Sequence, residues 1–501
     1  MIVSGRTLVA DTVLEHDVVV VGTGAGGSMA TRELARAGKS VIAVEEGGDH
    51  TPADFDQRED TMLPILFQDR GGRMTTDLAI TVLQGRGVGG STIHNTNLCK
   101  RAPDAILDLW TQRHGVVGCK PSDLAPVFDE VERDLSVSTI PDDAINKNND
   151  ALRRGLAALG WRGGALSHNR VGCMRSGFCE LGCAYDAKQN ARKVLLPEAM
   201  ARGATVLSDT KVLRILHDGR RVSGVLAQTV TGKLVRIKAR AVVLSASATG
   251  SAALALVSGV PDPFDQIGRG LRIHPGGAVA GVFDDTVDGW QGIPQSWECT
   301  EHLDFAEGSD KRVWITTAFA HPIGTASLMP GFGADHMRAM RLYRRMAVLT
   351  AMVHDETEGR VTASPEGKPR IAYAMEPRDR AQLARGLRAG AEILLAAGAK
   401  EVHVPAVRPL IVRNKKDLAA IDLDFARPHS VPLTAVHPMG TMRMGEDRRR
   451  SVVDSRGRHH HLAGLFVADG SLFPTSLGGP PQISVYTLAR HLARHVADSV
   501  R

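Results

Sequence analysis

The chain has 501 residues, a formal net charge of +6 and 43% hydrophobic residues, as expected for a globular protein with two or three structural units. Basic and acidic residues alternate along it, so the positive charge does not predict binding to nucleic acid. No segment has the roughly 18–20 apolar residues of a membrane span, and the N-terminus lacks a signal-peptide pattern. We therefore expect a cytoplasmic protein without a membrane span.

Residues 17–48 predict a strand, a glycine-rich turn, a helix and a second strand. Gly22, Gly24 and Gly27 have the spacing G-x-G-x-x-G, which permits a tight turn and lets a pyrophosphate approach the backbone where the helix begins. Glu45 closes the second strand, where a carboxylate can accept hydrogen bonds from a ribose. The sequence therefore predicts a dinucleotide-binding unit near its N-terminus.

Later patterns predict that this first domain is discontinuous. Residues 203–256 have the pattern of a β-meander followed by a strand that returns to the first sheet, and residues 461–500 add a strand and a final helix. Between them lie strand-like segments and a long helix over residues 378–399. We predict an α/β fold (α+β overall) with a first domain over residues 1–285 and 435–501, a cysteine-rich insertion near residues 165–195, and an antiparallel-sheet substrate domain over residues 286–434.

Five motifs follow one another along the chain: GTGAGGSMA with VEEGG, GRGVGGSTIHNTNLCKRAPD, AVVLSASATGS, HPMGTMRMG and VADGSLFPT. Together they resemble the glucose–methanol–choline (GMC) family of FAD-dependent oxidoreductases over essentially the whole chain. The resemblance implies a Rossmann-type FAD-binding domain and oxidation of a small-molecule alcohol by hydride transfer to flavin N5, with dioxygen or another carrier as electron acceptor. The pattern in residues 355–404 is most similar to the branch that acts on fatty and other lipophilic alcohols.

The resemblance also assigns roles to individual residues. His437, at the head of HPMGT, is the implied general base, because imidazole with its ordinary pKa of about 6.5 accepts a proton near neutral pH. His94 falls where some family members bind the flavin covalently; the alternative is a histidine that only hydrogen-bonds to the flavin or a neighbour. The implied FAD-binding residues are Gly22, Gly24, Ala25, Gly27, Glu45, Arg86, Gly89, Gly90, Ser91, His94, Asn95, Thr96, Val212, Asp469, Gly470, Pro481, Gln482 and Ile483.

Three cysteines, Cys173, Cys179 and Cys183, have the spacing C-x5-C-x3-C. This spacing resembles catalytic subunits of FAD sugar dehydrogenases, in which three thiolates hold a 3Fe–4S cluster and electrons pass to an acceptor protein. Buried structural thiols and a zinc site with a fourth ligand from elsewhere are the alternatives. The other cysteines have no partner at metal-ligand spacing and are expected to pack in the core: Cys99, Cys119 and Cys299.

Pro480 occupies the position of a second active-site histidine or asparagine of the family. Because a proline side chain neither donates a hydrogen bond nor accepts a proton, we expect a site with one catalytic histidine, with Gln482 or His429 as the further hydrogen-bond partner. His274, in GRGLRIHPGG, is expected to be structural. The competing functions are a redox-neutral lyase of the same family and a NAD-dependent dehydrogenase, which the flavin-type VADGS turn disfavours.

Overall fold

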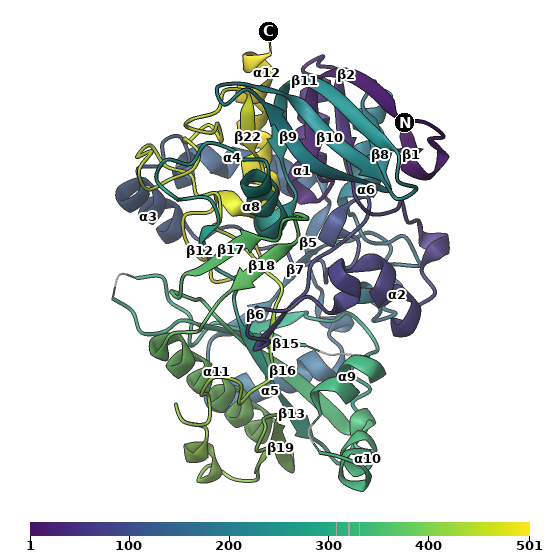
Figure 1. Ribbon diagram of the computed structural model, residues 1–501. Helices are drawn as coiled ribbons and strands as arrows, with labels where there is room; N and C mark the ends of the chain where they lie inside the picture. Colours follow the sequence, from purple (N-terminus) through teal and green to yellow (C-terminus); the bar gives the residue numbers. More distant parts are fainter. Residues whose placement is uncertain (307, 319–320, 330, 501) are drawn as a thin grey trace.

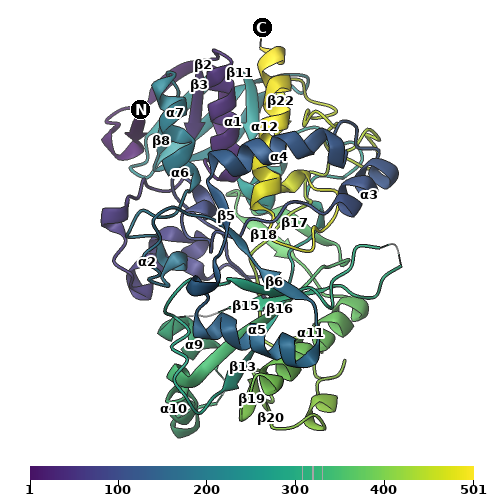
Figure 2. The ribbon, with the colours of Figure 1, turned by 180° about the vertical axis from the view of Figure 1, so that it is seen from behind.

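The computed structural model describes residues 1–306, 308–318, 321–329 and 331–500. Two large sheets organise the chain (Figure 1). The sheet that contains the N-terminal strand lies at the end of the molecule where both termini are found, and the second large sheet lies toward the opposite end (Figures 1 and 2). Among the described residues, no helix has the length and apolar character needed to cross a bilayer.

The first large sheet is built from eight strands. They are β1 (Ile2–Ser4), β2 (Thr12–Val21), β3 (Val41–Val44), β8 (Thr205–Ser208), β9 (Thr210–His217), β10 (Val222–Thr229), β11 (Leu234–Leu244) and β22 (Leu465–Val467). Their order is β1-β8-β3-β2-β11-β10-β9, and β22 pairs with the end of β11. Along the part β1-β8-β3-β2-β11 of this order, all neighbouring strands are parallel. Val18–Val21 of β2 are at most 5% exposed, as expected at the centre of a parallel sheet.

The strand–turn–helix–strand unit predicted for residues 17–48 is confirmed. Helix α1 (Ala25–Arg36) begins directly after the glycine turn, between β2 and β3. The C-terminal helix α12 (Gln482–Ser499) packs against α1, and the two run side by side in Figure 2. Helix α12 therefore returns to the unit that contains α1.

The predicted meander is also confirmed. Strands β9, β10 and β11 form an antiparallel ladder, and β11 then runs parallel to β2. Because β11 is long, its first half belongs to the meander and its second half to the buried centre of the sheet. The same strand pairs with β22, which brings Asp469 to the carboxyl edge of the sheet.

The second large sheet is mainly antiparallel. Its strands are β4 (Ile80–Val82), β6 (Gly163–Ala165), β13 (Gly276–Val282), β14 (Trp297–Cys299), β15 (Val313–Thr317), β16 (Met346–Val353), β19 (Glu401–Val404), β20 (Leu410–Val412) and β21 (Leu433–Ala435). The order is β20-β19-β13-β16-β15-β14-β6, with β21 paired to β13 and, in parallel, to β4. Helices α5 (Lys147–Leu159) and α11 (Pro377–Ala396) pack against it, and α11 matches the helix predicted over residues 378–399.

Strands from three parts of the chain enter the second sheet. β4, β6 and β13 lie outside residues 286–434, and two of them have only three residues. Such short strands carry no alternating pattern that a sequence could show. The residue ranges given for the two domains stay a prediction, because the chain crosses between the sheets several times.

A small hairpin connects the two parts of the molecule. Strands β17 (Gly359–Ala363) and β18 (Pro369–Ala372) pair with each other, and β17 pairs with β12 (Arg269–Leu271). The hairpin also packs on α8 (Ser247–Val257), the helix that follows β11. The turn of the hairpin thus lies beside α8, where a Cβ on Gly367 would lie 3.7 Å from the side chain of Val257.

Candidate active site

A cavity of about 1240 Å³ is lined by residues of both large sheets. One part of its wall is the glycine turn between β2 and α1, and another is the turn of the β17–β18 hairpin. The loop over residues 84–98 and the start of α12 complete the wall. The cavity therefore lies where the chain segments carrying the sequence motifs meet.

The glycine turn is shaped by one backbone conformation. Gly22 has a φ of +94°, which favours glycine, and a Cβ there would lie 2.4 Å from the carbonyl oxygen of Ser245. Gly22, Gly24 and Ala25 line the cavity, whereas Gly27 does not and instead packs α1 closely on the turn. These positions correspond to the separate roles of the glycines in a dinucleotide-binding turn.

Glu45 directly follows β3 and lines the cavity. Its carboxylate accepts hydrogen bonds from the backbone N–H and the hydroxyl of Thr23, at 3.0 and 2.9 Å, and from the N–H groups of Gly47 and Gly87. Burial raises the pKa of Glu45, and these hydrogen bonds oppose the rise. The carboxylate thus ties the glycine turn to the loop that begins at Gly85.

The loop after Gly85 supplies further predicted residues. Arg86, Gly90, Ser91, His94, Asn95 and Thr96 all line the cavity, and Gly89 does not. The amine of Lys188 lies beneath this loop and donates to the carbonyl oxygens of Ile93, Asn95 and Cys179. Burial lowers the pKa of Lys188 to about 8. This lysine, 1% exposed, holds the cavity loop against the cysteine segment.

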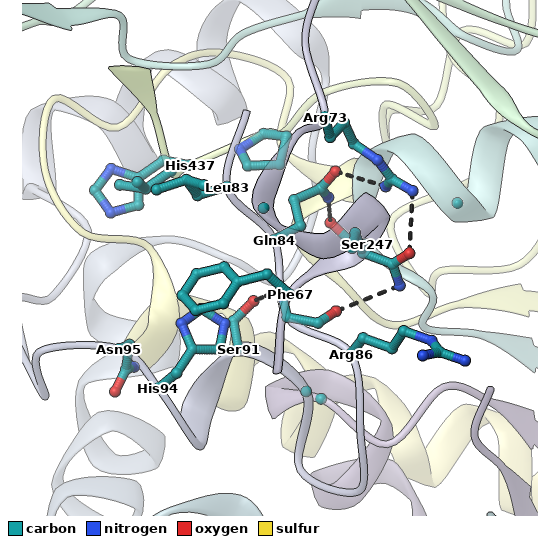
Figure 3. Close-up of a pocket in the computed structure, with 18 of the residues that line it drawn as sticks. Phe67, Arg73, Leu83, Gln84, Arg86, Ser91, His94, Asn95, Ser247 and His437 are labelled. Carbon is teal, nitrogen blue, oxygen red and sulfur yellow. Dashed lines mark hydrogen bonds between the residues drawn. The ribbon is translucent and has the colours of Figure 1, made fainter. Parts of the chain in front are cut away.

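His94 lies beside Phe67 on the cavity wall, with ring centroids 3.9 Å apart (Figure 3). Its Nε2 atom is buried and has no hydrogen-bond partner among the described residues. Burial, with a smaller effect of Lys188, lowers the pKa of His94 to about 3, so the ring is neutral at physiological pH. A neutral ring with an unpartnered nitrogen is compatible with a contact to a bound group.

Four residues that sequence reasoning missed form a hydrogen-bond network, and three of them, Arg73, Gln84 and Ser247, line the cavity (Figure 3). Arg73 donates to the side-chain oxygen of Gln84 at 3.0 Å, and Gln84 donates to the hydroxyl of Ser247 at 2.7 Å. Thr249 also donates to Gln84, at 2.8 Å. Gln84 precedes the glycine loop, and Ser247 lies in AVVLSASATGS, so these two could have been suspected; nothing in the sequence marks Arg73.

The C-terminal motif reaches the cavity where α12 begins. Asp469, Gly470, Pro480, Pro481 and Gln482 line it, and Val212 of β9 does so on another side, whereas Ile483 is buried behind the wall. The side chain of Gln482 accepts from Asn95 at 2.8 Å and donates to the carbonyl oxygen of Leu98 at 2.6 Å. Both ends of Gln482 are therefore bound to the protein.

His437 lines the cavity close to the end of β21 and is half-buried. Burial lowers the pKa of His437 well below its usual range, and the neighbouring His274 lowers it further. His429, the other residue considered as an extra partner, is exposed, lies 3.8 Å from Asp77 and does not line the cavity. His437 is therefore a neutral imidazole at the cavity surface.

The cysteines of residues 173–183 lie outside the main cavity. Cys173, Cys179 and Cys183 line a separate cavity of about 20 Å³ together with Lys188. Burial raises the pKa of the Cys179 thiol to about 11. Over the described ranges of the chain, no group of three or more His, Cys, Asp or Glu side chains is placed to hold a metal ion. The cysteines expected to pack, Cys99, Cys119 and Cys299, are buried.

Family models agree with this arrangement. Two models of GMC oxidoreductases match residues 63–276 and 355–489, and an FAD binding domain model matches residues 17–53. An uncharacterised GMC-type oxidoreductase of Mycobacterium tuberculosis is 34% identical over 498 residues, which is 98% of this chain and 77% of the relative. The chain belongs to the GMC oxidoreductase family. As a GMC member it is an FAD-dependent oxidoreductase.

Other GMC proteins resemble the chain over most of its length. A long-chain-alcohol oxidase of Arabidopsis thaliana is 28% identical over 97% of this chain and 68% of its own. The crystal structure of pyridoxine 4-oxidase from Mesorbium loti matches with a TM-score of 0.73 at 20% identity, over 96% of this chain and 98% of that one. A variant of Aspergillus oryzae formate oxidase matches with a TM-score of 0.73 at 16% identity, over 98% and 99%. These structures share the fold.

The cavity fits the FAD of the GMC family. Gly90 faces the glycine turn so closely that a Cβ at Gly90 would lie 2.7 Å from Cα of Gly24, which leaves a groove of bare backbone. A helix N-terminus at α1, a carboxylate at Glu45 and the unpartnered Nε2 of His94 surround this groove. The residues that would hold the cofactor are those of the glycine turn, Glu45, the loop over residues 86–96 and the start of α12.

Proposed function

We propose that the chain oxidises an alcohol to an aldehyde or ketone, with His437 as the general base. The observation that carries the proposal is the place of His437: it shares one cavity with the glycine turn and with the loop that carries His94. Bound FAD supplies the electron chemistry by taking up the two electrons of the oxidation. The protein must then provide a group that takes the hydroxyl proton, and a neutral imidazole suits this role.

A lipophilic alcohol is the proposed substrate class. Apolar side chains of Leu63, Phe67, Leu83, Leu181 and Leu328 line part of the cavity. Such a wall favours an aliphatic chain over a sugar, because it offers few hydrogen-bonding groups. The similarity to a long-chain-alcohol oxidase supports the same class.

Two finer features stay predictions within this proposal. The first is a 3Fe–4S cluster at the three thiols, and with it an electron-acceptor protein; the thiols line one small cavity, although over the described residues no such group is placed to hold a metal ion. The position of His94 on the wall of the main cavity supports a covalent flavin. Iron content with an EPR spectrum tests the cluster, and acid precipitation tests the bond, since a covalent flavin stays with the pellet.

Anaerobic reduction of the flavin by primary alcohols of increasing length tests the proposed function. In the His437→Ala variant, FAD should remain bound and its absorbance should no longer bleach, because the proton acceptor is lost. The exposed His429→Ala variant serves as the control and should bleach like the wild type. Normal bleaching of the His437→Ala variant would refute the role of His437.

A further inference from the structure

A second histidine, His274, contacts His437 outside the cavity lining. The Nδ1 atoms of His274 and His437 are 3.1 Å apart, and the rings lie nearly perpendicular, at 86°. His274 is 2% exposed and does not line the cavity. It therefore touches the proposed base without touching the space where a substrate would bind.

Two groups contact the other nitrogen of His274. The backbone N–H of Gly478 donates to Nε2 at 3.1 Å, and the hydroxyl oxygen of Ser476 lies 2.7 Å from the same atom. Position 478 requires glycine, because its φ is +71° and a Cβ would lie 2.7 Å from the ring of Phe305. An amide N–H only donates, so in this arrangement the lone pair of Nε2 faces Gly478.

This contact has a consequence for the hydrogen atoms of both rings. A neutral histidine carries one proton, so His274 with a free Nε2 carries it on Nδ1 and donates to Nδ1 of His437. His437 then carries its own proton on Nε2 and presents an N–H to the cavity. In this resting arrangement His437 donates a hydrogen bond to a substrate oxygen but has no lone pair to accept a proton.

In a second arrangement, both histidines adopt the opposite tautomer and both remain neutral. His437 donates from Nδ1 to His274, and His274 carries its proton on Nε2 and donates to the hydroxyl oxygen of Ser476. Between the two arrangements, the central proton crosses from one Nδ1 to the other. One proton leaves Nε2 of His437 to water, and one proton from water arrives at Nε2 of His274. Nε2 of His437 is then free to accept the hydroxyl proton of an alcohol.

We propose that His274 is a positioning residue that sets which nitrogen of His437 carries the proton, and that Ser476 makes the base-competent arrangement available. The inference rests on the proposed function, because it explains how His437 becomes a base. Gly478 stabilises the resting arrangement and Ser476 stabilises the competent one. The segment after the last strand, which has a proline in place of the second catalytic residue, thus acts on His437 through His274.

A double-mutant cycle tests the relay. Ser476→Ala removes the acceptor of the competent arrangement and fills no space. His274→Asn is the matched background: asparagine tolerates the φ of +51° at this position, and its short amide reaches the Nδ1 site of His274 but not Ser476. The quantities measured are the limiting rate of anaerobic flavin reduction by a primary alcohol and the apparent Kd of that alcohol, with the holoenzymes.

In the wild-type background, Ser476→Ala should lower the limiting rate by at least about tenfold, because it removes a proton-accepting form, while the Kd changes by less than about twofold. In the His274→Asn background, the same substitution should change the rate by less than about twofold. A wild-type rate in the Ser476→Ala variant would overturn the proposal. An equal loss in both backgrounds would also overturn it, since Ser476 would then act without His274.

Histidine ring nitrogens give a readout without turnover. In holoenzyme labelled with ¹⁵N-histidine, the signals lost in the His437→Asn variant belong to His437, and they should show the proton on Nε2 in the resting wild type. A proton on Nδ1 would overturn the assignment. The proposed function fails separately, if the His437→Ala variant still bleaches; the relay alone fails, if His437→Ala is inactive while Ser476→Ala reduces its flavin at the wild-type rate.

Discussion

His168 makes folding stability sensitive to acid. It is fully buried, and its Nε2 donates to the carbonyl oxygen of Gln295 at 2.9 Å. Burial lowers the pKa of His168 to about 3, whereas an unfolded histidine has a pKa of about 6.5. Below pH 6.5 the unfolded chain therefore binds a proton that the folded chain does not, and the free energy of unfolding falls as the pH falls toward the folded pKa. Between pH 7 and pH 5 this one residue should cost about 2 kcal/mol.

The His168→Gln variant isolates this contribution. Glutamine keeps a donor near the Nε2 position and does not titrate, so the variant should lose about 2 kcal/mol less stability than the wild type between pH 7 and pH 5. Urea unfolding followed by tryptophan fluorescence at pH 7, 6 and 5 measures the difference, and other buried histidines cancel in the comparison. The exposed His429→Gln variant is the control and should follow the wild type. Equal acid sensitivity of wild type and His168→Gln would refute the reasoning.

Three further substitutions test the cavity and the lysine beneath its loop. Gly90→Ala should abolish FAD retention, because the new Cβ would lie 2.7 Å from Cα of Gly24 and φ at this position is +55°. The ratio of flavin to protein absorbance measures retention. The control Gly164→Ala, whose Cβ would enter open space, should retain FAD. Lys188→Met should lower the free energy of unfolding by about 2–4 kcal/mol, because three carbonyl oxygens lose their hydrogen-bond donor. The control Lys238→Met, at an exposed strand position, should have little effect. Urea unfolding measures both variants. Pro480→Asn should raise the limiting rate of flavin reduction, since it adds a hydrogen-bonding side chain to the cavity wall; an unchanged rate would mean that another group already supplies this contact.

The local unit around Gly22 could be predicted from the sequence because all of its signals lie within about thirty residues. The same holds for α11, whose apolar positions repeat at helical spacing over five turns. The small strands β4 and β6 could not be predicted, because each pairs through a three-residue segment whose partner lies far along the chain. Long-range pairing is decided by tertiary packing and leaves no local pattern.

The candidate site divides in the same way. His437, His94 and Glu45 lie in motifs, and the structure places all three on one cavity. His274 was expected to be structural from the sequence. Only the structure shows that its Nδ1 contacts Nδ1 of His437, the proposed base. The tautomer of a histidine depends on partners from several chain segments, here Ser476 and Gly478, which no spacing rule connects with it.

The pairing of β4 with β21 has a consequence for biosynthesis. β4 (Ile80–Val82) leaves the ribosome long before β21 (Leu433–Ala435), the strand with which it pairs in the sheet. β6 likewise waits for β14, which is made later. The nascent chain must therefore keep parts of the second sheet unpaired until these later strands are made, and pairings of such sequence separation form slowly. We expect chaperone demand and aggregation during expression to depend on the speed at which the segment between β4 and β21 is translated.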